Sequence, residues 1–203
     1  MTGKKPVRDR LLNAAAELFY SQGVAATGID KITARAGVAK MSLYNNFSSK
    51  ADLVETYLES RVVEWQSRLA EKLRQATTPQ DRILAVFDSY LDYARPDNAV
   101  TFRGCGLLNA AAELPVSDPG RALVASQKDE VVHFFAENLA DMMGQDLATV
   151  RETAQHLSFV LEGGMARAGL DGSDERLKLA RTIAVSILAH LPRRTTRMEA
   201  PKA

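Results

Sequence analysis

The spacing of apolar residues is the feature that most limits what this chain can fold into. Along nearly the whole sequence, apolar residues recur three or four positions apart, which is the period of one face of an α-helix. The longest series runs from Val54 through Leu58, Val62, Trp65 and Leu69 to Leu73. No stretch alternates apolar and polar residues over the length of a β-strand. The sequence therefore predicts an all-α fold of about nine helices.

Turn and capping residues divide the chain into these helices. Gly23 and Gly37 are expected to end the first two, because glycine readily adopts the left-handed conformation that closes a helix. Two capping boxes, Thr27-Gly-Ile-Asp30 and Ser49-Lys-Ala-Asp52, predict the starts of the second helix and of a long fourth helix. A short third helix is expected over 39–45. Later helices are expected over 80–94, 120–143, 147–168 and 174–191, and the apolar segment 102–114 lies among them.

Charge is distributed unevenly along the chain. Residues 1–50 carry eight basic and three acidic residues, whereas the other 153 residues carry 18 basic and 22 acidic ones. The total of +1 therefore hides +5 on the first part and −4 on the rest. Such asymmetry indicates a polyanion-binding N-terminal part, and a chance clustering of solvated lysines is the alternative.

Several classes of protein are not supported by the sequence. No apolar run approaches the roughly 18 residues of a membrane span, so no membrane partner is expected. The single Cys105 cannot form an intrachain disulfide, which fits a reducing cytoplasm. His133, His156 and His190 are far apart, and no glycine-rich phosphate loop or serine elbow is present. We therefore expect no enzyme activity, no cofactor and no metal site.

Residues 27–46 follow the plan of a helix-turn-helix. Two short helices meet at Gly37, and the second of them would lie in the major groove of DNA. Its outward positions, which can reach base edges, are Lys40, Ser42 (or Met41), Tyr44 and Asn45. Residues better placed to hold the phosphate backbone, which positions a protein without specifying sequence, are Thr27, Tyr44, Asn46 and Lys50.

The same segment carries a resemblance to a known family. Residues 32–47 read Ile-Thr-Ala-Arg-Ala-Gly-Val-Ala-Lys-Met-Ser-Leu-Tyr-Asn-Asn-Phe, and Ser-Lys-Ala-Asp-Leu follows at 49–53. This sequence closely resembles the DNA-binding signature of the TetR family, whose members are all-helical dimeric regulators, mostly repressors that a small ligand releases from DNA. The resemblance covers about residues 8–57. It implies that Tyr44 and Lys50 contact phosphate and that positions 40, 42 and 45 read bases.

Three positions depart from the family pattern. The family often has serine where Ala39 stands, so we expect the third helix to lack a side-chain cap. Glycine is frequent where Met41 stands, and the methionine side chain would touch a thymine methyl group or simply pack. Histidine is usual where Asn46 stands, and an asparagine there donates to phosphate without charge. These departures leave the operator sequence open.

The rest of the chain, residues 53–203, is assigned by the resemblance to ligand binding and dimerisation, and residues 1–52 to DNA binding. Aromatic residues with a few polar neighbours are typical of a small-molecule pocket, although ordinary core packing is the alternative for each one. The candidates are Phe87, Tyr90, Tyr93, Phe102, Cys105, Leu108, Asn109, Phe134 and Phe135. The effector itself is not identified. A redox role for Cys105 is a weaker alternative to a structural one.

The last two helices each have an apolar face edged with small residues. The family pairs these helices with their symmetry mates in a four-helix bundle, which implies a homodimer. A dimer also suits DNA, since two recognition helices about 34 Å apart can read successive major grooves. The predicted interface residues are Leu157, Leu161, Gly164, Ile183 and Ile187.

These features together predict a ligand-responsive, DNA-binding transcriptional regulator in a bacterial cytoplasm, on the nucleoid when bound. We expect a repressor that a small-molecule effector releases from a palindromic double-stranded operator. Two alternatives stay open: an activator of the same fold, and a helical interaction protein that binds DNA without specificity.

Overall fold

Helices alone form the described part of the chain. The computed structural model describes residues 5–94, 102–143 and 147–192, and these contain nine α-helices and no strand. In chain order the helices are α1 (Val7–Gln22), α2 (Ile29–Ala36), α3 (Lys40–Tyr44), α4 (Lys50–Leu73), α5 (Pro79–Leu91), α6 (Gly106–Ala112), α7 (Pro119–Met143), α8 (Leu147–Asp171) and α9 (Glu175–Ala189). The all-α fold and the helix number that the apolar spacing predicts are confirmed.

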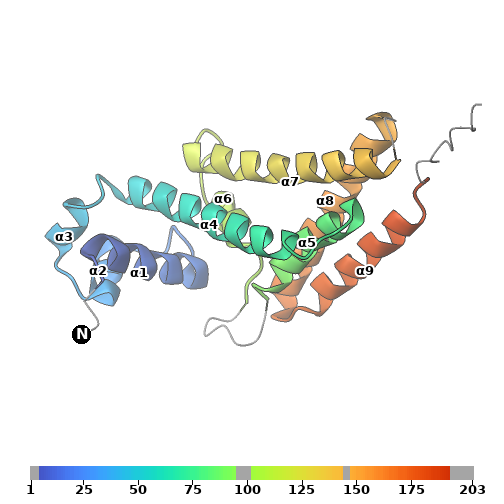
Figure 1. The fold of residues 1–203 in the computed structure, drawn as a ribbon. Helices are drawn as coiled ribbons and strands as arrows, with labels where there is room; N and C mark the ends of the chain where they lie inside the picture. Colours follow the sequence, from blue (N-terminus) through green and yellow to red (C-terminus); the bar gives the residue numbers. More distant parts are fainter. Residues whose placement is uncertain (1–4, 95–101, 144–146, 193–203) are drawn as a thin grey trace, which may run out of the picture.

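The helices form two groups joined by one long helix. Helices α1, α2 and α3, the head, lie at one end of the molecule, and α5, α7, α8 and α9, the body, lie at the other (Figure 1). Helix α4 starts beside the head and runs into the body, where it packs on α5 and α7. The short helix α6 contacts α1, α4 and α7, so it lies between the two groups.

The turn of the helix-turn-helix depends on Gly37. This residue has a φ of 63°, in the left-handed region, and the N–H of Val38 donates to the carbonyl of Thr33 at 3.0 Å. Both features are typical of a helix that ends on glycine. The guanidinium of Arg10 donates to the carbonyls of Ala36 and Gly37 at 2.5 and 2.8 Å, so the turn is also tied to α1.

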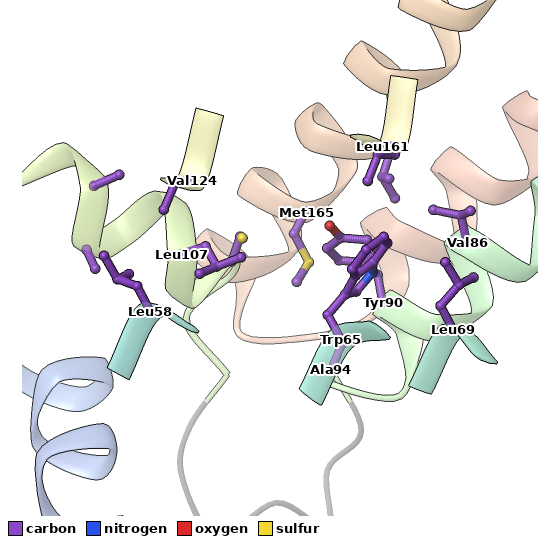
Figure 2. Packing of buried hydrophobic residues seen from close by; sticks show 14 of the residues in the cluster. Leu58, Trp65, Leu69, Val86, Tyr90, Ala94, Leu107, Val124, Leu161 and Met165 are labelled. Carbon is purple, nitrogen blue, oxygen red and sulfur yellow. The ribbon is translucent and has the colours of Figure 1, made fainter. Parts of the chain in front are cut away.

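The apolar stripe of α4 is buried, as predicted. Leu58, Trp65 and Leu69 are all less than 10% exposed. Figure 2 shows Leu58 beside Leu107 of α6, Trp65 beside Tyr90 and Met165, and Leu69 beside Val86 of α5. Burying one such large side chain stabilises the fold by about 1.5–3 kcal/mol, so α4 is fixed firmly to the body.

One predicted capping box is wrong and a second is half formed. The residue that precedes α2 is Gly28, with no side-chain cap, and the Thr27 hydroxyl donates instead to the carbonyl of Gly23 at 2.6 Å. Thr27 is fully buried, because it closes the loop between α1 and α2. At α4 the hydroxyl of Ser49 accepts from the N–H of Asp52 as predicted, but the Asp52 carboxylate turns to the N–H and hydroxyl of residue 48.

A complete capping box that the sequence analysis missed begins α5. The hydroxyl of Thr78 accepts from the N–H of Asp81 at 3.1 Å, and the Asp81 carboxylate accepts from the N–H of Thr78 at 3.0 Å. Pro79 occupies the first helical position, where its missing N–H costs nothing. The spacing Thr-x-x-Asp before an apolar run was the available signal.

Gly37→Ala should lower the free energy of unfolding by about 1–2 kcal/mol, because a residue with a Cβ is strained at this left-handed φ. The new Cβ would also lie 3.1 Å from Nη2 of Arg10. Urea denaturation followed by circular dichroism measures the loss. Gly37→Asn is the control and should lose less, since asparagine tolerates this conformation better. An alanine variant as stable as the parent would show that the turn is not strained.

Candidate functional site

The short helix α3 presents its polar side chains at the end of the head. It begins directly after the Gly37 turn, and Ala39 provides no side-chain cap, as expected. Its exposed residues are Lys40, Met41 and Tyr44, and Asn45, directly after the helix, is exposed as well. Met41 is 68% exposed, so it does not pack within the chain and is free to meet a base. Ser42 is half-buried.

The residues predicted to hold phosphate differ in accessibility. Tyr44 is 47% exposed. The amine of Lys50 donates to the carbonyl of Val24 at 2.6 Å, and the amide of Asn46 donates to a main-chain carbonyl of α3 at 2.7 Å. Thr27 is 0% exposed, so a phosphate contact through its side chain does not fit this conformation. The sequence analysis placed Thr27 at a helix start, whereas it lies beneath the preceding loop.

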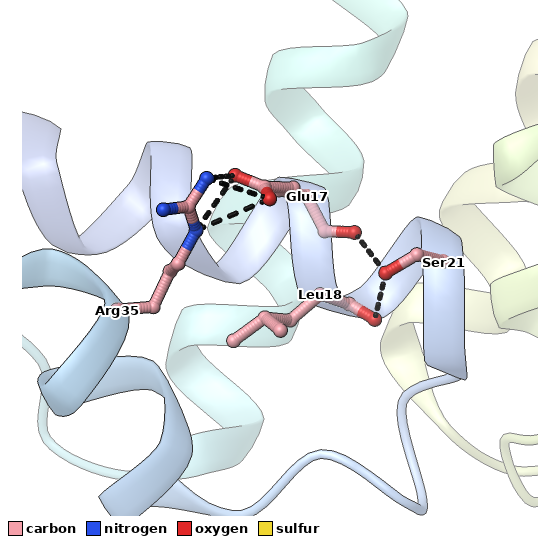
Figure 3. A network of polar contacts seen from close by, with 4 residues as sticks. All are labelled: Glu17, Leu18, Ser21 and Arg35. Atoms are coloured by element: carbon pink, nitrogen blue, oxygen red, sulfur yellow. Dashed lines mark hydrogen bonds and ion pairs between the residues drawn. The ribbon is translucent and has the colours of Figure 1, made fainter. Parts of the chain in front are cut away.

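Part of the basic charge of the head is held by acidic partners. Arg35 of α2 forms a bidentate ion pair with Glu17 of α1 at 2.7 Å, and both side chains are largely exposed (Figure 3). Nζ of Lys40 lies 2.8 Å from the Asp30 carboxylate, which raises the pKa of Lys40. Exposed ion pairs contribute little to stability, so a phosphate or a base can take the place of Asp30.

A cavity of about 290 Å³ lies where α4 meets the head and the body. It is bordered by α1, α4, the end of α5, the segment around α6, and α8. Its volume is near the lower end of the range of small-molecule sites, about 300–1,000 Å³. Because α1 forms one wall, a molecule in this cavity would touch the head directly. The lining residues are Ala16, Glu17, Tyr20, Arg61, Glu64, Trp65, Arg68, Tyr90, Tyr93, Phe102, Gly104, Cys105, Gly106, Leu107 and Met165.

The structure brings together four of the nine residues predicted to line a pocket. They are Tyr90, Tyr93, Phe102 and Cys105. The rings of Phe87 and Phe135 stack at 6.0 Å within the core instead. The amide of Asn109 donates to the carbonyl of Arg103 at 2.8 Å, and neither Asn109, Leu108 nor Phe134 borders the cavity.

The sequence analysis missed the charged residues of the cavity wall. Arg61, Glu64 and Arg68 lie on α4, and the Glu64 carboxylate pairs with both guanidinium groups, at 2.7 Å in the case of Arg68. Their spacing of three and four places them on one helix face. That spacing, around Trp65 of the apolar stripe, was the signal that could have found them.

A mostly buried lysine contacts Tyr90, one of the residues that line the cavity. Nζ of Lys128 in α7 is 2.8 Å from the Glu162 carboxylate in α8, 3.2 Å from the Tyr90 hydroxyl and 3.6 Å from Sγ of Cys105. Burial alone would lower the pKa of Lys128, but Cys105, Tyr90 and Glu162 outweigh it and hold that pKa above its usual value. Burial raises the pKa of Tyr90 to about 12, so its hydroxyl stays protonated. The Lys128 charge is therefore already partnered.

The segment around α6 is fastened to the head. The Tyr20 hydroxyl donates to the carbonyl of Gly104 at 3.1 Å and accepts from the N–H of Arg103 at 2.7 Å. The Arg103 guanidinium donates to the main-chain carbonyl of Tyr20 at 2.8 Å. The Glu113 carboxylate accepts from the N–H of Ala25 at 2.7 Å. Since Tyr20 also borders the cavity, this link begins at the cavity wall.

Three of the five residues predicted for the dimer interface serve contacts within the chain. Leu157 and Leu161 are 0% exposed, and a Cβ on Gly164 would lie 2.5 Å from that of Ala180 in α9. They belong to the face of α8 that packs on its own chain, which the apolar period does not distinguish from an interface. Ile183 is 42% exposed, whereas Ile187 is half-buried.

Other apolar side chains of α8 and α9 point outward. The exposed ones are Phe159 at 68%, Leu170 at 81%, Leu179 at 50% and Ile183 at 42%. On α8 the outward positions 159, 163, 166 and 170 form one helical stripe that includes Gly163, where an added Cβ would meet nothing. On α9 the exposed Leu179 and Ile183 are four positions apart and lie on one helix face. The two helices pack against each other.

Within the described ranges, none of the helices is long and apolar enough to cross a membrane. The same ranges contain no cluster of three or more His, Cys, Asp or Glu side chains that could hold a metal ion.

Comparison with known proteins links this architecture to a family. Residues 11–57 match the sequence model of bacterial regulatory proteins of the tetR family. The transcriptional activator FasR of Mycolicibacterium smegmatis is 37% identical over 91 residues, which span 45% of this chain and 42% of FasR. The transcriptional repressor DhaR of a Mycobacterium species is 25% identical over 192 residues, which span 91% of this chain and 93% of DhaR.

The likeness extends to the three-dimensional structure. A TetR-family transcriptional regulator from Streptomyces coelicolor superposes with a TM-score of 0.82 at 28% identity, over 91% of this chain and 95% of that one. The sequence match covers the helix-turn-helix, and the structural match covers nearly the whole chain. The chain therefore belongs to the TetR family of DNA-binding transcriptional regulators.

Proposed function

We propose that the protein is a homodimeric repressor that leaves a palindromic operator when a small molecule occupies the cavity between α4 and α1. The observation that carries this proposal is the cavity wall, to which both the head and the body contribute. A molecule bound there contacts α1 and α4 at once, so its affinity depends on how these helices are placed. A ligand that prefers a placement unsuited to DNA shifts the protein toward that state.

On DNA, α3 lies in the major groove and the surrounding residues hold the backbone. We assign base contacts to Lys40, Ser42 and Asn45, with Met41 placed to meet a thymine methyl group. Tyr44, Asn46 and Lys50 are assigned to phosphates. Lys40 must leave Asp30 to reach a base, and the exposure of that ion pair makes this exchange easy.

The dimer forms through the outward stripes of α8 and α9. Phe159 and Leu170 on α8, with Leu179 and Ile183 on α9, present apolar surface that a second copy would cover. Gly163 in the same stripe allows two helices to approach closely. A symmetric pair of this kind places two heads on successive major grooves, about 34 Å apart.

Repression is supported by the similarity to DhaR along nearly the whole of both chains. FasR, named as an activator, favours the second candidate, activation by the same fold, but its match spans less than half of either chain. A reporter gene behind the protein's own operator separates the two: deleting the regulator raises expression under repression and lowers it under activation.

Lys40→Ala should change the preference among operator sequences, because it removes a base contact worth about 1–3 kcal/mol of discrimination. Tyr44→Phe removes only a phosphate hydrogen bond and should weaken all duplexes by a similar factor. Fluorescence anisotropy with the operator, single-base variants of it and random DNA, at rising salt, measures both effects. Equal losses from the two variants on every duplex would contradict the division of roles. Loss of all preference for the operator over random DNA by the parent protein would favour the non-specific alternative.

Phe159→Glu and Ile183→Glu should each convert the dimer to a monomer at micromolar concentration, because a carboxylate would be buried without a partner. Operator affinity should fall at least tenfold, since one head alone binds a half-site weakly. Light scattering after size-exclusion chromatography measures the mass. Val116→Glu is the control, because Val116 is 86% exposed in the loop before α7. Dimers that survive both changes on α8 and α9 would place the interface elsewhere.

An effector should both stabilise the protein and release the operator. A ligand present at 100 times its Kd stabilises the folded state by about 2.7 kcal/mol, which a thermal-shift screen detects. Compounds that pass are then titrated into the protein–operator complex. Ala16→Leu, which adds volume to the α1 wall of the cavity, should weaken both effects of the compound. Compounds that stabilise the protein but leave operator affinity unchanged would argue against induction through this cavity.

A further inference from the structure

Three N–H donors of the cavity wall have no acceptor. Nε of Arg61, Nε1 of Trp65 and Nε of Arg68 are buried, and none of them has a hydrogen-bond partner within the described residues. All three residues border the cavity. They lie on α4 four and three positions apart, and therefore on one face of the helix. Buried polar groups are nearly always hydrogen-bonded, so a row of unsatisfied donors at a cavity indicates a binding site for acceptor atoms.

The charges around these donors favour an anion. Arg61 and Arg68 supply two positive charges, and Glu64 between them is the acid that pairs with both. The other acid of the wall, Glu17, is held in a bidentate pair by Arg35 of α2. One positive charge is therefore left uncompensated beside the three donors. A cationic ligand would meet two guanidinium groups at this place, whereas a carboxylate can accept from both of them.

The remaining walls suit a flat or short apolar body. The rings of Trp65, Tyr90 and Tyr93 form a group, with centroids 6.2 and 6.4 Å apart in that order, and Phe102 and Met165 also border the cavity. Figure 2 shows Trp65, Tyr90 and Met165 close together beside α4. A volume of about 290 Å³ limits the ligand to a small molecule.

We infer that the effector is a small monocarboxylic acid with an aromatic or short aliphatic body, whose carboxylate accepts from Arg61, Trp65 and Arg68. The body of the ligand packs on the aromatic wall, and the carboxylate lies on the face of α4 that shares the cavity with α1. This inference rests on the proposed function only in taking the cavity as the effector site. Lys128 does not compete as the anion receptor, because Glu162 already pairs with it at 2.8 Å.

The acid group is tested with matched ligands that differ in one functional group. Benzoate, naphthalene-2-carboxylate and 4-phenylbutyrate are titrated calorimetrically into the full-length protein. Each is compared with its neutral amide and with the amine of the same skeleton. At least one acid should bind ten times more tightly than its own amide, and the amines should bind more weakly still. If no acid binds more tightly than its amide, or if an amine binds best, the inference is overturned.

Variants of α4 then locate the carboxylate. Arg68→Met should weaken binding of the preferred acid at least tenfold and change binding of its amide little. Trp65→Phe keeps an aromatic ring and removes the Nε1 donor together with part of the ring. It should weaken the acid about threefold to tenfold and its amide less. Arg74→Met is the control, because Arg74 follows α4 with its side chain 74% exposed and should leave both affinities unchanged. Equal losses for acid and amide would show a packing effect and overturn the inference.

Arg61→Met provides a second measurement if the Arg68 variant does not fold, since both guanidinium groups are proposed to donate to the carboxylate of the ligand. Operator release measured in parallel separates the two claims. An acid that binds through Arg61 and Arg68 but does not release the operator supports the ligand class and refutes induction. A neutral amide that releases the operator, with the arginine variants unaffected, supports induction and refutes the ligand class.

Discussion

The packing of one continuous helix into both parts of the molecule is the constraint on which the rest depends. Helix α4 begins at its Ser49 cap beside the head and buries Leu53 there, and it buries Trp65 and Leu69 in the body. Its 24 residues span about 36 Å without a break. Because a helix of this kind transmits a displacement along its axis, a shift at Trp65 must either move the head or break the α4–head contacts.

A second connection between head and body runs through the segment around α6, so the cavity is enclosed by two links and not by α4 alone. The segment around α6 is tied to α1 by the hydroxyl of Tyr20. It is tied by Glu113 to the loop between α1 and α2. The cavity lies between these two links, and α1, α4 and the α6 segment form its walls. The three hydrogen bonds at Tyr20 and Glu113 join main-chain groups to side chains, so they fix distance as well as direction. A molecule that enlarges the cavity therefore acts on the position of α1 through two routes.

The helices were predictable from the sequence because each buries a face with its own period. The Gly37 turn followed from residue type for the same local reason. The packing partner of each apolar face was less predictable, since the spacing of apolar residues does not reveal what covers that face. Leu157 and Gly164 are covered within their own chain, whereas Phe159 is exposed. The charges of Arg61 and Arg68 resembled a solvated surface, because only the fold shows that these side chains line one cavity with α1 and the α6 segment. The capping role predicted for Thr27 was wrong because the local pattern does not show that this side chain is buried beneath a loop, where its hydroxyl donates to Gly23.

The unsatisfied donors on α4 also bear on how such a protein switches. A buried N–H without an acceptor costs about 1–3 kcal/mol, and this cost persists in any state that keeps the cavity closed around Arg61, Trp65 and Arg68. A ligand that supplies the acceptor removes the cost only in the arrangement that lets it in. To shift a two-state equilibrium from 99:1 to 1:99, the ligand must bind the favoured arrangement more tightly than the other by about 5.5 kcal/mol. Two or three charge-assisted hydrogen bonds, together with burial of an apolar body, are of that size. If such a ligand makes these contacts in one arrangement only, as the proposed mechanism requires, the polarity of the α4 wall would supply a differential affinity of the size needed to move the head.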